Sequence, residues 1–222
     1  GFEGTLSSAE QGIAAKGKAA VNASDIEPWL MTAGFGLPGM GTGTGVDLTA
    51  DADYAGGLLV LSGLEGTVAD GAVAGDVNLE LKEGVPHLSG QMALDEIDLY
   101  PLARLILGDD TLESADSGWA TTPFQQKSLA PFTADLDLNA GSLAAGPIAT
   151  ASDAQASLRL DTDGLRVSDL TGELAGGKVS GLFELKNNDG SGLLTAQLRL
   201  TNADVSQIVP GIGLSGRGDF ST

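Results

Sequence analysis

An internal repeat is the feature that most limits what this chain can fold into. The stretch LEGTVADGAVAG (64–75) recurs 106 residues later as LTGELAGGKVSG (170–181), and both follow the pattern Leu-x-Gly-x-apolar-Ala-x-Gly-x-Val-x-Gly. The repeat extends without a gap over 61–99 and 167–205, and a partial third copy covers 17–28. Because it preserves glycine spacing and no reactive group, the repeat indicates a duplicated structural unit.

Most of the chain alternates apolar and polar residues with a period of two. Examples are VDLTADADY (46–54), ADLDLNA (134–140) and LTAQLRLT (194–201). Such strands have one apolar and one hydrated face, which is typical of antiparallel sheets. Segments such as ADGA (69–72) and AGGK (175–178) supply hairpin turns between them. The sequence therefore predicts an all-β fold of curved antiparallel sheet, with a few short helices.

Each repeat is expected to form a hairpin in which two glycines face each other on the apolar side. The assumed two-residue loops are 70–71 in the first copy and 176–177 in the second. The expected cross-strand pairs are Leu64 with Val77, Gly66 with Gly75, Val68 with Val73, Leu170 with Phe183, Gly172 with Gly181 and Leu174 with Val179. Together with Leu194, Leu198 and Leu200 of the following strand, these residues are the candidate lining of an apolar groove.

Two glycines opposite each other in strand interiors weaken a sheet unless they serve a purpose. They permit a sharp bend of the sheet or close approach of another group on the apolar side. The first interpretation predicts an elongated, unfilled apolar groove built from repeats. The alternative is a β-sandwich, in which a helix or a second sheet packs over the same face. The alternation alone leaves both interpretations open.

Four segments are expected along the chain. They are a partial repeat and connection at 1–45, a first, abbreviated β-groove repeat at 46–108, an acidic loop at 109–130 and a second β-groove repeat at 131–222. The first repeat lacks a strand that corresponds to residues 136–149 of the second. The chain is also expected to be a fragment of a longer protein.

Three short segments depart from the strand pattern, and each begins at an aspartate. They are DIEPWLMTAG from Asp25, DLYPLARLILG from Asp98 and DVSQIVPG from Asp204. Aspartate is a preferred N-cap residue, and proline in the first turn of the first two segments is also typical of helix starts. We therefore expect short helices at the ends of repeats.

Net charge excludes some classes of partner. Thirty acidic residues oppose eleven basic ones, which gives a formal charge of −19. A chain without a basic stripe is not expected to bind nucleic acid or to dock through its polar face on an anionic membrane. The classes of partner that remain are an apolar ligand, a cation or another protein.

Residues that could carry chemistry are few. His87 is the only histidine and is expected in a surface turn beside Pro86. DTDG (161–164) has only the start of a calcium loop and is expected to be a hairpin turn, while GMGTGTG (39–45) is expected to be a connection. No serine or carboxylate has an evident activating partner. We expect no enzymatic activity, no cofactor and no metal site.

Several motifs in the second half resemble the AsmA-like family of bacterial envelope proteins. They are W-x3-PF (119–124), then ADLDLNAGSLAAGPI (134–148), then ASLRLDTDGLRVSDLTGELAGGKVSGLFEL (156–185), in that order. The resemblance covers about two thirds of the chain. It implies a long groove of curved antiparallel sheet whose apolar lining shields phospholipid acyl chains.

The resemblance also implies a location and partners. Such a protein is periplasmic and is anchored in the inner membrane by an N-terminal helix that this sequence lacks, and it moves phospholipid towards the outer membrane to maintain it. Its partners would be phospholipid acyl chains and other envelope proteins. The alternative function is a structural β-sandwich module of an envelope or surface protein that binds other proteins.

Overall fold

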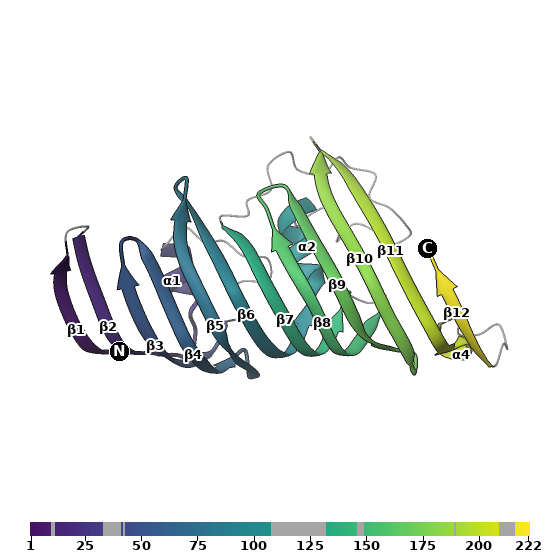
Figure 1. The fold of residues 1–222 in the computed structure, drawn as a ribbon, viewed down its shortest axis with the longest axis horizontal. Helices are drawn as coiled ribbons and strands as arrows, with labels where there is room; N and C mark the ends of the chain where they lie inside the picture. Colours follow the sequence, from purple (N-terminus) through teal and green to yellow (C-terminus); the bar gives the residue numbers. More distant parts are fainter. Residues whose placement is uncertain are drawn as a thin grey trace.

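The strands form one open sheet that runs the length of the molecule, with the two termini at opposite ends (Figure 1). The computed structural model describes residues 1–9, 12–32, 41, 43–107, 132–145, 149–188, 190–208 and 216–222. The strands are β1 (Phe2–Ala9), β2 (Gly12–Ala23), β3 (Val46–Ala55), β4 (Leu58–Val68), β5 (Gly71–Lys82), β6 (Val85–Asp98), β7 (Thr133–Ala144), β8 (Thr150–Leu160), β9 (Gly164–Leu174), β10 (Gly177–Asn188), β11 (Ser191–Asp204) and β12 (Arg217–Ser221). Each strand pairs with the next in chain order.

This arrangement confirms the all-β fold and contradicts the β-sandwich alternative. A sandwich needs two hydrogen-bonded sheets packed face to face, whereas the twelve described strands form one curved, unclosed sheet. The predicted acidic loop at 109–130 lies outside the described residues. The sheet is nevertheless continuous on either side of this segment, because β6 pairs directly with β7. The pairing runs from His87 opposite Thr133 to Asp98 opposite Ala144.

The sequence repeat coincides with the strand boundaries. Adding 106 to the bounds of β4, β5 and β6 gives the bounds of β9, β10 and β11. The second copy has one further strand, β7, ahead of the four strands that the two copies share. Both copies are therefore the same meander of strands, built once with four strands (β3–β6) and once with five (β7–β11).

The extra strand is accommodated by one parallel pairing. Among the described strands, β6 and β7 are parallel and all other neighbours are antiparallel. With five strands in the second copy, this parallel step makes β2, β6 and β11 run in the same direction. These strands are followed by the helices α1 (Glu27–Thr32), α2 (Leu99–Leu107) and α4 (Val205–Ile208). All three helices therefore begin on the side of the molecule where β2, β6 and β11 end.

The predicted aspartate caps are present at all three helices. The Oδ1 atom of Asp25 accepts a hydrogen bond from the backbone N–H of Glu27 at 2.9 Å. Asp98 makes the same contact with Tyr100 at 2.9 Å, and Asp204 with Ser206 at 3.0 Å. Each cap pairs an N–H group that has no partner within the helix.

The predicted hairpin register is wrong by two residues. The loops are 69–70 and 175–176, so Gly66 lies opposite Val73 and Gly181 lies opposite Leu170. The turn residues Ala69 and Ala175 adopt left-handed φ angles of 49° and 51°, where glycine would be expected. Gly71 and Gly177 are the first residues of β5 and β10, and a Cβ on Gly177 would overlap the backbone of Thr201 in β11. The two glycines of each hairpin therefore do not form a paired gap.

The repeated glycines instead allow neighbouring strands to approach closely. Gly75 and Gly181 are equivalent in the two copies. A Cβ on Gly75 would overlap the carbonyl oxygen of Gln91, and a Cβ on Gly181 would overlap that of Gln197, which is the repeat equivalent of Gln91. Gly181 also has a φ of +148°, which a residue with a side chain rarely adopts. This shared backbone contact accounts for the faithful spacing at these positions.

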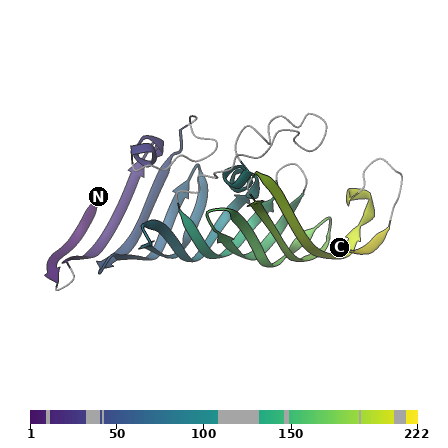
Figure 2. The ribbon, with the colours of Figure 1, turned by 90° about the horizontal axis from the view of Figure 1, so that it is seen from above.

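The main core lies under α2. Leu99, Ile106 and Leu107 of this helix are buried against β7, β9 and β10. The largest fully buried side chains are Ile106, Leu160, Leu165 and Val167. A second, smaller cluster in β3–β5 contains Ala50, Leu64, Val73 and Val77. Figure 2 shows α1 and α2 on the same side of the sheet.

Candidate apolar binding face

All fifteen predicted groove residues project from the same side of the sheet. The register places directly paired residues on one side, and successive pairs connect the strands across the sheet. We call this side the apolar face. Its predicted members are Leu64, Gly66, Val68, Val73, Gly75, Val77, Leu170, Gly172, Leu174, Val179, Gly181, Phe183, Leu194, Leu198 and Leu200. The alternation therefore identified the correct face although the turn register was wrong.

These fifteen residues are less accessible than an open channel would require. Leu64, Val73, Val77, Leu170 and Val179 are buried, nine others are half-buried and Leu194 is exposed. Part of this burial comes from neighbouring side chains on the curved sheet and part from α2.

Helix α2 covers the apolar face across β7 to β10. Its C-terminal end is held there by Asn187, whose Nδ2 atom donates a 2.9 Å hydrogen bond to the backbone oxygen of Ile106. Ile106 itself has no exposed surface. The expectation of an unfilled channel along the whole face is therefore wrong in this section. The helix divides the accessible apolar surface into an N-terminal section on β1–β5 and a C-terminal section on β11–β12.

Exposed apolar side chains concentrate on these two sections. Nine of the thirteen exposed large hydrophobic residues among the described part of the chain lie on the apolar face. The N-terminal section holds Phe2, Leu6, Ile13, Val21, Tyr54, Leu79 and Leu81, and the C-terminal section holds Leu194 and Phe220. Soluble proteins seldom expose contiguous apolar surface of this kind without a binding role.

Sequence reasoning missed most of these exposed residues. It concentrated on the conspicuous glycine hairpins, which lie in the better covered middle of the sheet. The register of β1 with β2 and of β2 with β3 brings Leu6, Ala15 and Tyr54 into one row. The period-two pattern of GIAAKGKAAV (12–21) was a signal for this face, but its alanines and glycines made it weak.

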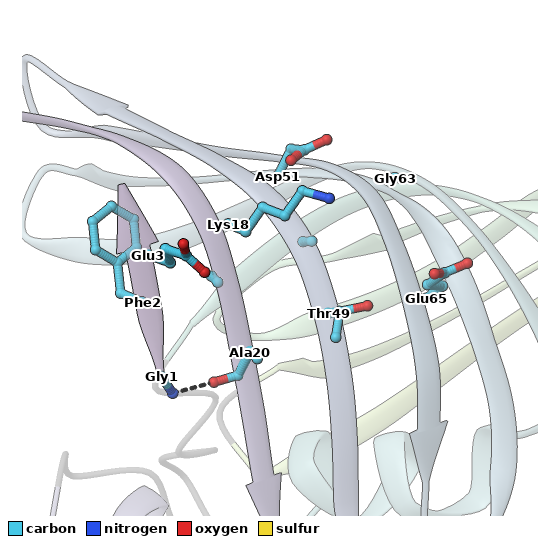
Figure 3. A pocket seen from close by; sticks show the side chains of 11 residues that line it. Gly1, Phe2, Glu3, Lys18, Ala20, Thr49, Asp51, Gly63 and Glu65 are labelled. Carbon is cyan, nitrogen blue, oxygen red and sulfur yellow. Dashed lines mark hydrogen bonds between the residues drawn. The ribbon is translucent and has the colours of Figure 1, made fainter. Parts of the chain in front are cut away.

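The opposite side of the sheet, which we call the polar face, is hydrated and charged. Lys16 forms a 3.0 Å ion pair with Asp53 across β2 and β3. A hollow of about 580 Å³ opens on this face over β1–β4, and Glu3, Lys18 and Asp51 line it from adjacent strands (Figure 3). Four charged residues, Glu3, Lys18, Asp51 and Glu65, share its lining with small and apolar residues. Among the described residues, no cluster of groups could hold a metal ion.

Charged pairs on the polar face also shift carboxylate acidity. Lys186 Nζ lies 2.9 Å from Glu184 Oε1. The hydrogen bond from Lys186 lowers the pKa of Glu184, and the same contact raises the pKa of Lys186. Both residues lie on β10, and an exposed ion pair within one strand contributes little to stability.

The expectation for His87 is wrong. The residue lies within β6 and is buried, with 5% of its surface exposed. Its Nδ1 atom is 2.9 Å from Thr133 Oγ1, and Nε2 is 3.7 Å from Asp135 Oδ2, both on β7. A strand that begins 46 residues later along the chain supplies these neighbours, so local sequence did not show them.

The expectation for residues 161–164 is confirmed. Asp161 N–H donates a 2.8 Å hydrogen bond to the oxygen of Gly164, which closes the hairpin between β8 and β9.

No described helix is long and apolar enough to cross a lipid bilayer. The chain matches no protein-family model, no curated protein and no solved structure. The resemblance of its repeat motifs to AsmA-like proteins therefore stays a prediction.

Proposed function

We propose that this chain is a non-enzymatic segment of a periplasmic lipid conduit that shields phospholipid acyl chains on its apolar face. The observation that carries the proposal is the concentration of exposed large hydrophobic side chains on one face of a single open sheet. The motif resemblance to AsmA-like proteins supports the assignment to transport between the inner and outer membranes.

The energetics of lipid transfer suit such a surface. Each methylene group of an acyl chain that leaves water gains about 0.8 kcal/mol. A row of aliphatic side chains can provide this gain without any specific pocket, while the phospholipid headgroup stays in water. The acidic polar face keeps the segment soluble and keeps it from binding anionic surfaces.

Helix α2 restricts how lipid uses the face. Acyl chains can reach the N-terminal section at Tyr54 and Leu79, and the C-terminal section at Leu194, whereas Ile106 occupies the face between them. Lipid that moves from one section to the other passes beside α2 or displaces it.

Two pairs of leucines provide a matched test. Leu79 on the apolar face and Leu58 on the polar face are 41% and 38% exposed. Leu194 and Leu193 form the same kind of pair in β11, with 53% and 56% exposed. Each pair is matched in residue type and exposure and differs in the face it occupies.

The experiment measures phospholipid bound to each aspartate variant by native mass spectrometry and by uptake of a fluorescent phospholipid. We expect Leu79→Asp and Leu194→Asp to reduce binding about tenfold or more, because a carboxylate opposes contact with acyl chains. Leu58→Asp and Leu193→Asp should bind as the unchanged protein does. Lipid-free protein, or equal losses in both members of a pair, would refute the proposal.

A protein-interaction module is the second candidate. Strands β1 and β12 each pair with one described neighbour, and open strand edges can accept a strand from another protein. In that case the four aspartate variants would leave binding of the protein partner unchanged, and no phospholipid would be recovered.

A further inference from the structure

Helix α1 presents two large apolar side chains to solvent. Trp29 is 72% exposed and Met31 is 68% exposed. The helix lies on the same side of the sheet as α2 (Figure 2), but it does not bury these side chains as α2 buries Ile106. A tryptophan with so much exposed surface is unusual unless it has a partner.

The base of α1 is held by a polar network around Asp25 and Glu27. The carboxylate of Glu27 is buried and accepts hydrogen bonds from Gly41 N–H at 2.6 Å and from Thr44 Oγ1 at 3.0 Å. Asp25 Oδ1 accepts from the N–H of Thr44 at 3.2 Å as well as from Glu27. Both acidic groups of this region are therefore bonded within the protein, and α1 is held in a defined orientation.

The exposed side of α1 carries no polar side chain that needs water. Its exposed residues are Pro28, Trp29, Met31 and Thr32. The hydroxyl of Thr32 donates a 2.7 Å hydrogen bond to the backbone oxygen of Pro28. Placing this surface in an apolar medium therefore costs little, since no hydroxyl or carboxylate loses its only hydrogen-bond partner.

The sequence around α1 is also free of charge. Residues 28–46 contain no Asp, Glu, Lys or Arg, although the chain has 41 such residues in total (30 acidic and 11 basic). A protein partner of this acidic chain would be expected to use basic groups against acidic ones. An uncharged apolar surface with an exposed tryptophan better suits the headgroup region of a bilayer, where the amphipathic indole ring is favoured.

We propose that α1 docks on the surface of a phospholipid bilayer with uncharged or zwitterionic headgroups, through Trp29 and Met31. Docking of this kind is shallow and reversible, because two side chains enter the interface and no segment spans it. The proposal depends on α1 alone and does not require acyl chains to bind the apolar face. The net charge of −19 adds a condition: anionic lipid in the bilayer should weaken docking, and added salt should relieve that effect.

The first test uses phosphatidylcholine vesicles. The chain has two tryptophans, so Trp119→Phe leaves Trp29 as the only indole reporter. We expect its fluorescence to shift to shorter wavelength when vesicles are added, and the shift to decrease when phosphatidylglycerol is included at low salt. An unchanged spectrum with phosphatidylcholine vesicles would overturn the proposal.

The second test uses flotation with the same vesicles. The double variant Trp29→Ser and Met31→Ser should lose about tenfold or more of the bound fraction. A matched double variant, Leu58→Ser and Leu193→Ser, removes two exposed hydrophobic residues from the polar face and should bind normally. Equal losses of vesicle binding in both double variants would overturn the proposal. It would also be overturned if the unchanged protein did not bind vesicles and the Trp29 and Met31 substitutions only abolished its association with further copies of itself. Bound phospholipid in the α1 variant, measured by native mass spectrometry, should not change, and this separates docking from the function proposed above.

Discussion

The side-chain amide of Asn187, near the end of β10, donates a hydrogen bond of 2.9 Å to the backbone oxygen of Ile106, 81 residues earlier in the chain. The contact is buried, and it pairs one of the carbonyl groups that a helix leaves without a partner at its C-terminal end. Asn187 is also bound into the turn that follows, because its Oδ1 accepts a 3.0 Å hydrogen bond from Gly190 N–H. The residue therefore joins α2, β10 and a hairpin turn.

Replacing Asn187 should loosen α2 from the apolar face. We expect Asn187→Ala to lower the free energy of unfolding by about 1–3 kcal/mol, because the buried carbonyl of Ile106 loses its partner. The neighbouring Asn188 is exposed, and Asn188→Ala should change the stability by less than about 0.5 kcal/mol. Urea denaturation followed by circular dichroism measures both. Similar stability for the two variants would show that this contact does not hold the helix.

The side chain of Ile106 should contribute more to the free energy of unfolding than the hydrogen bond that its backbone oxygen accepts from Asn187. It is fully buried, and we expect Ile106→Ala to cost about 2–5 kcal/mol through lost apolar burial and a residual cavity. Leu81 on the apolar face is 70% exposed, and Leu81→Ala should cost less than about 0.5 kcal/mol. Thermal unfolding of both variants checks the expectation. A small effect at Ile106 would contradict the packing of α2 on the sheet.

Gly181 should tolerate no side chain. We expect Gly181→Ala to lower the free energy of unfolding by about 2–4 kcal/mol, because its Cβ would overlap the Gln197 backbone and its φ is unfavourable for alanine. Gly84 also has a positive φ, of +83°, but a Cβ there would meet no atom within 4 Å. Gly84→Ala therefore measures the cost of φ alone. Equal denaturation midpoints would show that the close strand approach has no energetic role.

Gly66 is not a suitable position for a substitution that tests ligand binding. A Cβ at Gly66 would overlap the Asp47 backbone, so a leucine introduced there to fill the apolar face would disrupt the sheet. Substitutions at exposed leucines are therefore the better probes of ligand binding.

Asp76 should make the pairing of β4 with β5 sensitive to pH. Its Oδ1 accepts a 2.8 Å hydrogen bond from Gly63 N–H at an irregular position of that pair, and this bond lowers the pKa of Asp76, with a further contribution from Gln91. A carboxyl group whose pKa is lower in the folded state stabilises the fold at higher pH, and this stabilisation is lost as the pH falls through the lowered pKa. The stability difference between the unchanged protein and Asp76→Asn should therefore shrink on acidification. Urea midpoints measured at neutral and acidic pH test this, and a constant difference would exclude the contribution.

Local sequence predicted those features that depend on neighbouring residues. The alternation around Leu194, Leu198 and Leu200 placed these side chains on one face, because successive side chains of any strand point to opposite sides. Asp25, Asp98 and Asp204 marked three helix starts, because a cap needs only the next two or three backbone N–H groups. The 106-residue repeat located equivalent strands with identical bounds.

Features that depend on distant partners were not predictable in this way. The hairpin register was misplaced, because the rule that puts glycine in the turn does not hold here: Ala69 and Ala175 adopt the left-handed turn conformation instead. His87 was misplaced, because Thr133 and Asp135 reach it only through the parallel pairing of β6 with β7.

The sequence by itself thus determined the strands, their apolar face, the duplication and the helix caps, since each follows from the period of side chains or from hydrogen bonds within a few residues. Only the tertiary structure decided which parts of that face stay open. The parallel step from β6 to β7 carries α2 across the sheet, where Ile106 and Asn187 fix it over β7 to β10. Burial of one helix against β7, β9 and β10 is a property of contacts between distant segments, and no local pattern of residues specifies it.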